Sequence, residues 1–212
     1  MTTRPACLVF LAGTGTAVGK TWTAAAVLAR LRGAGLRVGA RKPAQSFDAA
    51  EGSTDADVLA AATGEAPHDV CLPHRWYARA LAPPMAAEAL GAPPFTVGDL
   101  LDELRWSDGV DVGLVEGAGG PLSPIAADGD NVTLSSAIAP DLVLLVADAG
   151  LGTINAVRMS GAAFAEEERV VVVLNRFDEH DPLHHRNRDW LGCRDGFDVV
   201  TDVEAAAARI VP

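Results

Sequence analysis

Apolar runs of strand length alternate with segments of helical periodicity along the chain. The runs predict five strands, at residues 7–12, 36–42, 111–116, 141–150 and 169–175. Apolar positions at helical spacing, closed by glycine or polar residues, predict helices at 22–35, 55–64, 85–91 and 95–106. The acidic run at 166–168 is interpreted as a solvated helix end.

The predicted strands are apolar on both faces, and helices lie between them. This pattern is typical of a parallel sheet covered by helices on both sides, the arrangement of an α/β protein. No internal repeat or low-complexity linker divides the 212 residues. We therefore expect a single domain over residues 1–212.

A glycine-rich segment joins the first predicted strand to the first predicted helix. It consists of Gly13, Thr14, Gly15, Thr16, Ala17, Val18, Gly19, Lys20 and Thr21. A strand before it and a helix after it are the context of a phosphate-binding P-loop, in which backbone N–H groups and the helix N-terminus face the phosphates. Lys20 is expected to reach the β- and γ-phosphates of ATP, and the Thr21 hydroxyl to bind Mg²⁺. The fold class is therefore that of a P-loop NTPase.

The glycine spacing of this loop differs from the usual P-loop pattern. The pattern G-x-x-x-x-G-K-[ST] would place the first glycine at position 14, where the chain has Thr14. Here the glycine lies one residue earlier, at Gly13. The loop is thus a variant P-loop.

Lysine is rare in this chain, and its two positions are informative. The chain has 17 basic side chains, of which only Lys20 and Lys42 are lysines. Lys42 ends the second predicted strand, and parallel α/β sheets bind ligands beyond the carboxyl ends of their strands. Lys20 and Lys42 are therefore predicted to flank one transferring phosphoryl group.

Two carboxylates are predicted near the same edge. Glu116 ends the third predicted strand, where ATPases place an acid directed at magnesium, and four residues with three glycines follow it. Asp55 begins a helix, so it is either a metal ligand or a charge favoured by the helix dipole. Asp57 is a competing candidate.

Charge and composition exclude several classes of function. The net charge of −11 argues against a nucleic-acid binder, which needs clustered basic residues. Three scattered cysteines indicate neither a disulfide framework nor a thiolate zinc site. No apolar run reaches the ~18–20 residues of a membrane span, so we expect a cytoplasmic protein without a membrane partner.

Taken together, five motifs resemble those of the dethiobiotin synthetase family. They are the loop at 13–21, KPAQS at 42–46, TDADVL at 54–59, VEGAGG at 115–120 and AGLGTIN at 149–155, in the family's order. The resemblance covers roughly residues 7 to 177. Any one motif is shared more widely among P-loop ATPases, whereas the set of five is specific.

The resemblance implies an ATP-dependent ring-closing ligase of biotin synthesis. Family members convert 7,8-diaminopelargonate and CO₂ to dethiobiotin with MgATP. One amine captures CO₂ as a carbamate, which attacks the γ-phosphate and gives a carbamic–phosphoric anhydride. The second amine then closes the ring and expels phosphate.

The resemblance also implies roles for individual residues. Lys20 and Lys42 would stabilise charge in catalysis, while Thr21, Asp55 and Glu116 would hold magnesium. The remaining roles are substrate binding and adenine binding. Thr16, Lys42, Ser46 and Gly119 would contact the amines or carbamate, Asn155 would bind the substrate carboxylate across a homodimer interface, and Asn175 would contact adenine.

The chain also departs from the family pattern. Many members have aspartate at the place of Gly15 and glycine at the place of Phe47. The family's late proline-containing segment, which helps to hold adenine, is not recognisable near 195–200. With Asn175 alone reading the base edge, only weak preference for ATP is expected.

Two alternative functions share the P-loop. A partitioning-type ATPase switch that acts through protein partners would have a second lysine in the loop, where this chain has Gly15, and often carries a basic membrane- or DNA-binding helix. An amide-forming ligase of the cobyrinate-synthase type would need an additional glutaminase domain. The ring-closing ligase fits the sequence better than either alternative.

Overall fold

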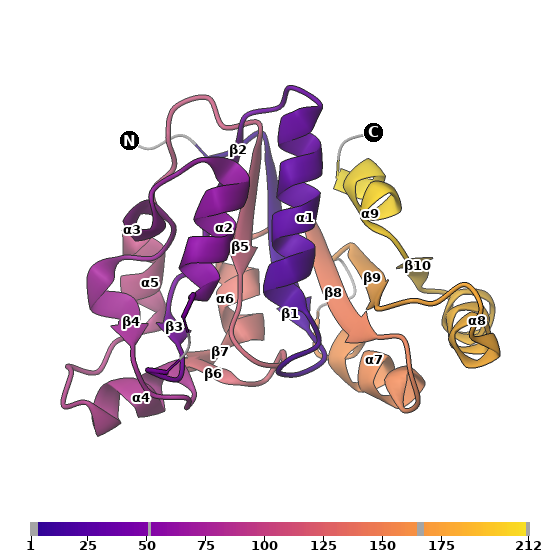
Figure 1. Cartoon of the computed structure of the whole chain (residues 1–212). Helices are drawn as coiled ribbons and strands as arrows, with labels where there is room; N and C mark the ends of the chain where they lie inside the picture. Colours follow the sequence, from indigo (N-terminus) through magenta and orange to yellow (C-terminus); the bar gives the residue numbers. More distant parts are fainter. Residues whose placement is uncertain (1–3, 51, 165–167, 211–212) are drawn as a thin grey trace.

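A six-stranded parallel sheet forms the centre of the computed structural model, which describes residues 4–50, 52–164 and 168–210. The strand order is β10-β9-β8-β1-β5-β2, and every neighbouring pair is parallel. Figure 1 shows the carboxyl ends of these strands at the lower edge. The strands are β1 (Cys7–Gly13), β2 (Val38–Arg41), β5 (Val112–Glu116), β8 (Leu142–Asp148), β9 (Val170–Asn175) and β10 (Asp198–Val200).

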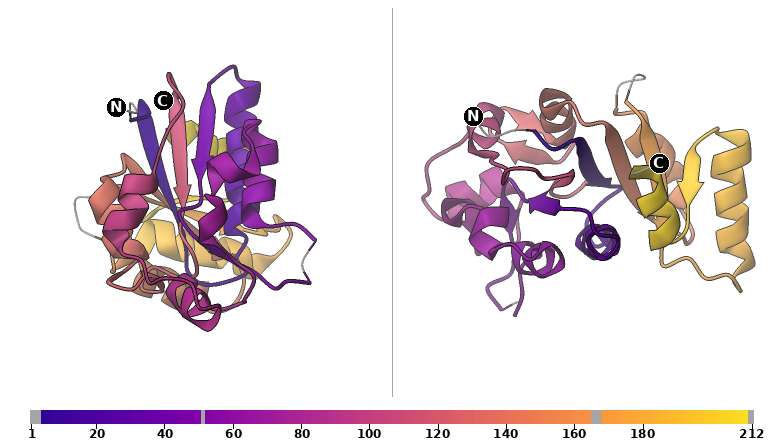
Figure 2. Two further views of the ribbon diagram at one scale, coloured as in Figure 1. Left: turned by 90° about the vertical axis from the view of Figure 1, so that its left-hand side faces the viewer. Right: turned by 90° about the horizontal axis from the view of Figure 1, so that it is seen from above.

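Helices cover both faces of the sheet (Figure 2). One apolar core lies between the sheet and α1 (Lys20–Gly33), α2 (Asp55–Thr63), α3 (Pro67–Val70) and α9 (Val203–Ile210). The other core packs against elements that include α4 (Pro83–Ala89), α5 (Val97–Glu103), α6 (Asn131–Ile138), α7 (Thr153–Gly161) and the π-helix η2 (Trp190–Arg194). Alternate strand residues supply the two cores, because successive side chains of a strand point to opposite faces.

Short elements surround the carboxyl edge of the sheet. They are β3 (Gln45–Ser46) paired with β4 (Trp76–Tyr77), β6 (Pro124–Ala126) paired with β7 (Gly129–Asp130), the 3₁₀ turn η1 (Pro73–Arg75) and α8 (Pro182–Asp189). In Figure 1, β3, β4, α4, β6 and β7 lie below the sheet on one side of β5. Ser46 of β3 and Pro83 of α4 line one cavity together with residues that follow β1, β2 and β5.

The α/β fold class with a parallel sheet is confirmed, with differences at individual elements. The helix predicted at 22–35 begins two residues earlier, at Lys20. The helix predicted at 95–106 spans only 97–103, because Thr96 and Asp99 form a capping box at its start and Leu104 is already extended. The strand predicted at 141–150 ends at Asp148. Residues 166 and 167 of the predicted helix end lie outside the described residues.

Several elements after residue 130 were not predicted from the pattern. They are α6, α7, α9 and the edge strand β10, whereas α8 lies in the polar segment 179–189, which is interpreted from the sequence as a solvated helix start. β10 has only three residues and α8 is dominated by charged and polar side chains, so neither carries a clear apolar period. Among the described residues, no helix has the length and apolar character needed to cross a membrane.

Leu144 lies at the centre of this fold, so truncating it tests the sheet core. Its side chain is fully buried in β8, between β1 and β9. We expect Leu144→Ala to lower the free energy of unfolding by about 2–5 kcal/mol in a urea titration, because a cavity remains. Leu90→Ala, at a half-exposed position, should cost less than about 1 kcal/mol. Equal losses for the two variants would contradict this placement of the core.

Candidate active site

The loop from Thr14 to Gly19 folds over the N-terminus of α1. Gly19 precedes the helix with a positive φ of 94°, and no side chain caps the helix among the described residues. Its first N–H groups therefore remain available to an anion. The Lys20 ammonium donates to the Gly15 carbonyl oxygen at 2.8 Å, so its side chain lies along the loop.

The shifted glycine of this variant loop has a steric reason. A Cβ atom on Gly13 would lie 2.8 Å from the Cγ of Lys20 and 2.8 Å from a methyl group of Val18. Any larger residue at position 13 would therefore displace the Lys20 side chain. Gly15, in contrast, has open space around its Cα hydrogens.

The end of β9 holds the same loop from the other side. The Asn175 side-chain amide donates to the Val18 carbonyl oxygen at 2.9 Å. A Cβ on Gly19 would come within 2.0 Å of that nitrogen, so Gly19 allows the close approach. Arg176 also donates to the Ala17 carbonyl oxygen, at 3.0 Å. The structure thus places Asn175 on the loop backbone, a contact that the sequence did not predict.

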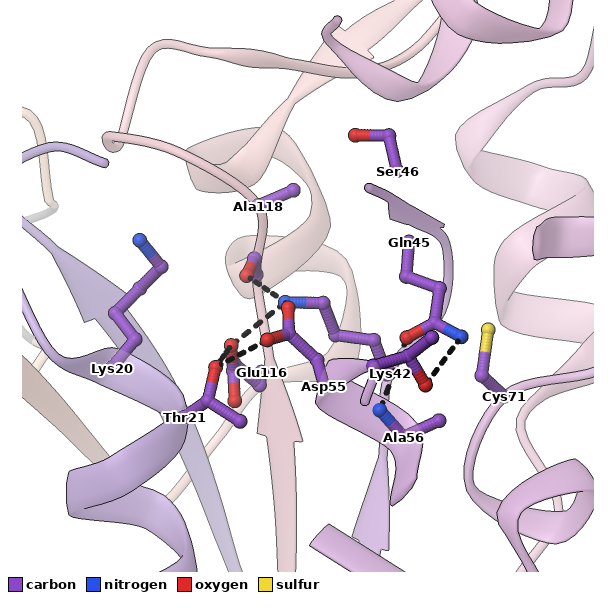
Figure 3. A network of polar contacts seen from close by, with 12 residues as sticks. Lys20, Thr21, Lys42, Gln45, Ser46, Asp55, Ala56, Cys71, Glu116 and Ala118 are labelled. Atoms are coloured by element: carbon purple, nitrogen blue, oxygen red, sulfur yellow. Dashed lines mark hydrogen bonds and ion pairs between the residues drawn. The ribbon is translucent and has the colours of Figure 1, made fainter. Parts of the chain in front are cut away.

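Lys42 is the more buried of the two lysines of the site. Its ammonium lies 2.7 Å from Glu116 Oε1 and 2.7 Å from Asp55 Oδ2, and it donates to the Gly117 carbonyl oxygen at 3.0 Å (Figure 3). Glu116 is fully buried and Lys42 is 2% exposed. The Lys42 ammonium therefore bridges the ends of β2 and β5 and the first residue of α2.

The pKa values of the two lysines shift in opposite directions. Burial alone would lower the pKa of Lys42, but Glu116 and Asp55 outweigh it and hold that pKa above its usual value. Burial and the neighbouring Lys42 charge lower the pKa of Lys20 to about 8. Lys42 in turn lowers the pKa of Asp55, whereas burial raises the pKa of Glu116.

Thr21 brings a hydroxyl to the same two carboxylates. Its Oγ1 lies 2.8 Å from Asp55 Oδ1 and 2.9 Å from Glu116 Oε1. The other carboxylate oxygen of Glu116, Oε2, is buried and has no hydrogen-bond partner among the described residues. Two carboxylates and a hydroxyl form an all-oxygen set of the kind that Mg²⁺ prefers together with phosphate oxygens, so the residues fit this ion.

Asp55 and Asp57, which the sequence left as alternatives, have different surroundings. Thr54 caps α2: its hydroxyl accepts from the Asp57 N–H, and the Asp57 carboxylate accepts from the Thr54 N–H at 2.8 Å. Asp57 is therefore engaged in a capping box. Asp55 faces Lys42 and Thr21 and is the carboxylate that belongs to the site.

A cavity of about 670 Å³ connects most of the predicted site residues. We call it the phosphate cavity. Of the residues predicted from the sequence, its lining contains Thr16, Ala17, Gly19, Lys20, Thr21, Lys42, Ser46, Asp55, Glu116 and Gly119. Asn155 and Asn175 do not line it. Asn155 is exposed on α7, and Asn175 borders a second cavity of about 600 Å³, the side cavity.

Two buried asparagines that the sequence analysis missed hold the loops of the site. Asn131, at the start of α6, accepts from the Ala118 N–H at 3.0 Å and donates to the Ala118 and Gly120 carbonyl oxygens at 2.6 and 2.7 Å. Asn187 in α8 donates to the Ala149 and Gly150 carbonyl oxygens, both at 2.9 Å. Neither residue belongs to a recognisable motif, so no local sequence signal would have found it.

Known proteins resemble this chain over most of its length. The family profile described as an AAA domain matches residues 8–207. A protein of Anaeromyxobacter sp. (strain Fw109-5) named ATP-dependent dethiobiotin synthetase BioD is 39% identical, over 82% of this chain and 78% of its own. The chain belongs to the dethiobiotin synthetase family. Family members of the same name from Rhodococcus jostii and Rhodopirellula baltica are 36% and 35% identical and cover 96% and 97% of it.

Solved structures place this dethiobiotin synthetase family member among the P-loop folds. A plasmid partition protein from Borrelia burgdorferi superposes with a TM-score of 0.57 at 11% identity, over 98% of both chains. Chloroplast FtsY from Physcomitrella patens gives a TM-score of 0.53 at 16% identity, over 100% of this chain and 67% of its own. At such identities the likeness shows the fold alone.

The buried Lys42–Glu116 pair predicts strong coupling in a double-mutant cycle. Lys42→Met should lower the free energy of unfolding by about 3–5 kcal/mol in Mg²⁺-free urea titrations, because it leaves Glu116 buried without its cation. The double variant Lys42→Met/Glu116→Gln should recover part of this loss. Additive effects of the two single changes would contradict the geometry.

Asn131 predicts a stability effect of its own. Asn131→Ala leaves the Ala118 N–H and the Gly120 carbonyl without their side-chain partner, which should cost about 1–3 kcal/mol of unfolding free energy. Thr133→Ala changes an exposed hydroxyl on the same helix and serves as the control. A loss at Asn131 no larger than at Thr133 would show that the loop does not depend on this amide.

Proposed function

We propose that this chain is an ATP-dependent ring-closing ligase that converts 7,8-diaminopelargonate and CO₂ to dethiobiotin, with release of ADP and phosphate. The observation that carries the proposal is the buried Lys42 beside the P-loop, in one cavity with Ser46 and Gly119. Family membership supports the same reaction. We place this activity in the cytoplasm.

The reaction begins when one substrate amine attacks CO₂ and loses a proton to give a carbamate. A carbamate oxygen then attacks the γ-phosphorus of ATP and ADP leaves. The second amine attacks the carbonyl carbon of the resulting anhydride, the ring closes and inorganic phosphate leaves. No protein nucleophile is needed, so the chain contributes positioning and charge stabilisation.

We assign the two lysines different roles in the reaction. Lys20 lies along the phosphate loop and donates to the Gly15 carbonyl. Among the described residues this is its one side-chain hydrogen bond, so its ammonium is free to turn toward a γ-phosphate. Lys42 is fixed by Glu116 and Asp55 at the opposite wall. There it is suited to neutralise the carbamate and the transferred phosphoryl group.

Thr21, Asp55 and Glu116 are the residues that we expect to hold Mg²⁺. When bound, the ion would neutralise charge on the β- and γ-phosphate oxygens. The unpartnered buried oxygen of Glu116 supports this assignment. Lys42 supplies the positive charge that balances these carboxylates in the structure.

Thr16, Ser46 and Gly119 are assigned to the amines and the carbamate. Ser46 already donates its hydroxyl proton to the Leu81 carbonyl at 2.5 Å, so its oxygen is oriented to accept from an amine N–H. Gly119 has a positive φ of 72°, a conformation that suits glycine where a backbone approaches a ligand. The phosphate cavity also has an apolar wall that suits the alkyl chain of the diamine, formed by Phe47, Leu81 and Pro83.

The substrate carboxylate is assigned to the start of α7 in a homodimer. Gly152 precedes this helix with a positive φ of 95°, and no side chain caps it among the described residues. Leu151 is 92% exposed and Met159 is 70% exposed, which is consistent with a partner subunit covering them. Asn155, exposed on the same helix, would bind the carboxylate across the interface.

A ¹⁴C-bicarbonate incorporation assay with the diamine and MgATP tests the activity directly. Lys20→Ala and Lys42→Ala should each reduce turnover by ~10²-fold or more, the scale of one lost charge-stabilising donor. Arg186→Ala removes an exposed cation from α8 and should leave turnover unchanged. A folded Lys42→Ala variant with near-normal turnover would rule out the proposed site.

The homodimer is tested by light scattering combined with the same assay. The mass should be twice the 21.9 kDa of one chain. Leu151→Arg should give a monomer with strongly reduced activity, because a charge in an apolar interface is costly. Leu183→Arg, on α8, is the control. A monomer with full activity would overturn the dimer.

A further inference from the structure

Trp22 occupies an unusual position in the first turn of α1. It follows Thr21 directly, and 61% of its side chain is exposed. Among the described residues its indole has no stacked ring and no cation over its face. A large aromatic surface is thus left open to solvent beside the loop that faces the phosphates.

The indole lies at the junction of the two cavities. Of the residues that the structure describes, only Gly19 and Trp22 line both the phosphate cavity and the side cavity. Gly19 has no side chain, so Trp22 supplies the only side chain common to both. A ligand that extends from the phosphate cavity into the side cavity would therefore pass beside the Gly19 backbone and the indole.

The side cavity has the chemistry of a nucleoside site. Its apolar walls include Val173, Leu174, Phe177 and Val203. Its polar groups come from Thr23, Asn175, Arg176, Thr201 and Asp202. The phosphate cavity, by contrast, contains both lysines. A triphosphate gripped by Lys20 and Thr21 would thus direct its sugar and base toward Trp22.

We propose that Trp22 is the nucleoside-positioning residue of this protein, and that the face of the bound nucleobase stacks on its indole. The inference rests on the ATP binding that is part of the proposed function, and it is independent of the diamine. Stacking is tolerant of base identity, because every base has a π-face.

The polar groups around the side cavity support base tolerance. The Asn175 amide nitrogen is already committed to the Val18 carbonyl. One Asp202 carboxylate oxygen accepts from the Ala205 N–H at the start of α9. Arg176 is likewise engaged, with Asp148 and the Ala17 carbonyl. These bonds reduce the polar groups that can read the edge of a base, so stacking on Trp22 is the contact that we expect to dominate.

Calorimetric titration of Trp22→Ala with Mg²⁺ complexes of ATP, GTP, CTP and inorganic tripolyphosphate tests the proposal. Binding of all three nucleotides should weaken by about 5- to 100-fold, the range for one lost base–aromatic stack. Tripolyphosphate binding should not change, because it needs only the loop. Trp22→Phe keeps an aromatic face and should lie between wild type and Trp22→Ala.

Trp190→Ala is the matched control, since Trp190 is also half-exposed (41%) but lies in η2, under Arg158 and Arg194. Its nucleotide affinity should equal that of the wild type. Three results would overturn the proposal: unchanged nucleotide affinity in Trp22→Ala, an equal loss for tripolyphosphate, or a changed oligomeric state, which would assign the indole to an interface. Failure of the proposed function would appear separately, as nucleotide binding by the wild type without dethiobiotin formation.

Discussion

The ion pairs of Lys42 with Glu116 and Asp55 are the interaction on which the arrangement of the site depends. An isolated ammonium with 2% exposure would lose most of its hydration, and only close carboxylates can offset that cost. The requirement fixes the spacing between the ends of β2 and β5 and the start of α2. The Thr21 hydroxyl, at the start of α1, donates to the same two carboxylates and so ties α1 to β2, β5 and α2. Four elements of the fold thus meet around one buried charge.

The phosphate loop is supported in a different way, by neutral hydrogen bonds and close packing. Gly13 leaves room for the stem of Lys20, while Asn175 and Arg176 hold the carbonyls of Val18 and Ala17. Its backbone is therefore fixed, whereas the end of Lys20 makes one bond within the loop. One lysine is anchored by charge and the other is free to follow its ligand. This difference follows from burial, because Lys42 lies deeper than Lys20.

The amino-acid pattern predicted the parts of the fold that have strong apolar signals. Five of the six sheet strands consist mainly of apolar residues and were predicted. The three-residue β10 and the polar α8 lack such a signal. The sequence also indicated which residues meet at the carboxyl edge, because strand ends and the loop motif are local features. The roles of Asn131 and Asn187 were not predicted, since the backbone groups that they bind lie 8 or more residues away in sequence. Asp55 and Asp57 were separable in principle, because Thr54 and Asp57 have the spacing of a capping box.

Arg176 has a consequence for communication between the two ends of the site. Its guanidinium donates to the Ala17 carbonyl of the phosphate loop and forms an ion pair with Asp148 at 2.8 Å. Asp148 in turn accepts from the N–H of Gly150, in the segment that leads to α7. The Arg176 side chain thus contacts the phosphate loop directly and, through Asp148, the segment that precedes α7. In the homodimer that we propose, a bound phosphate that shifted this arginine would also change the affinity between subunits. By thermodynamic reciprocity, subunit association would then change phosphate affinity by the same factor.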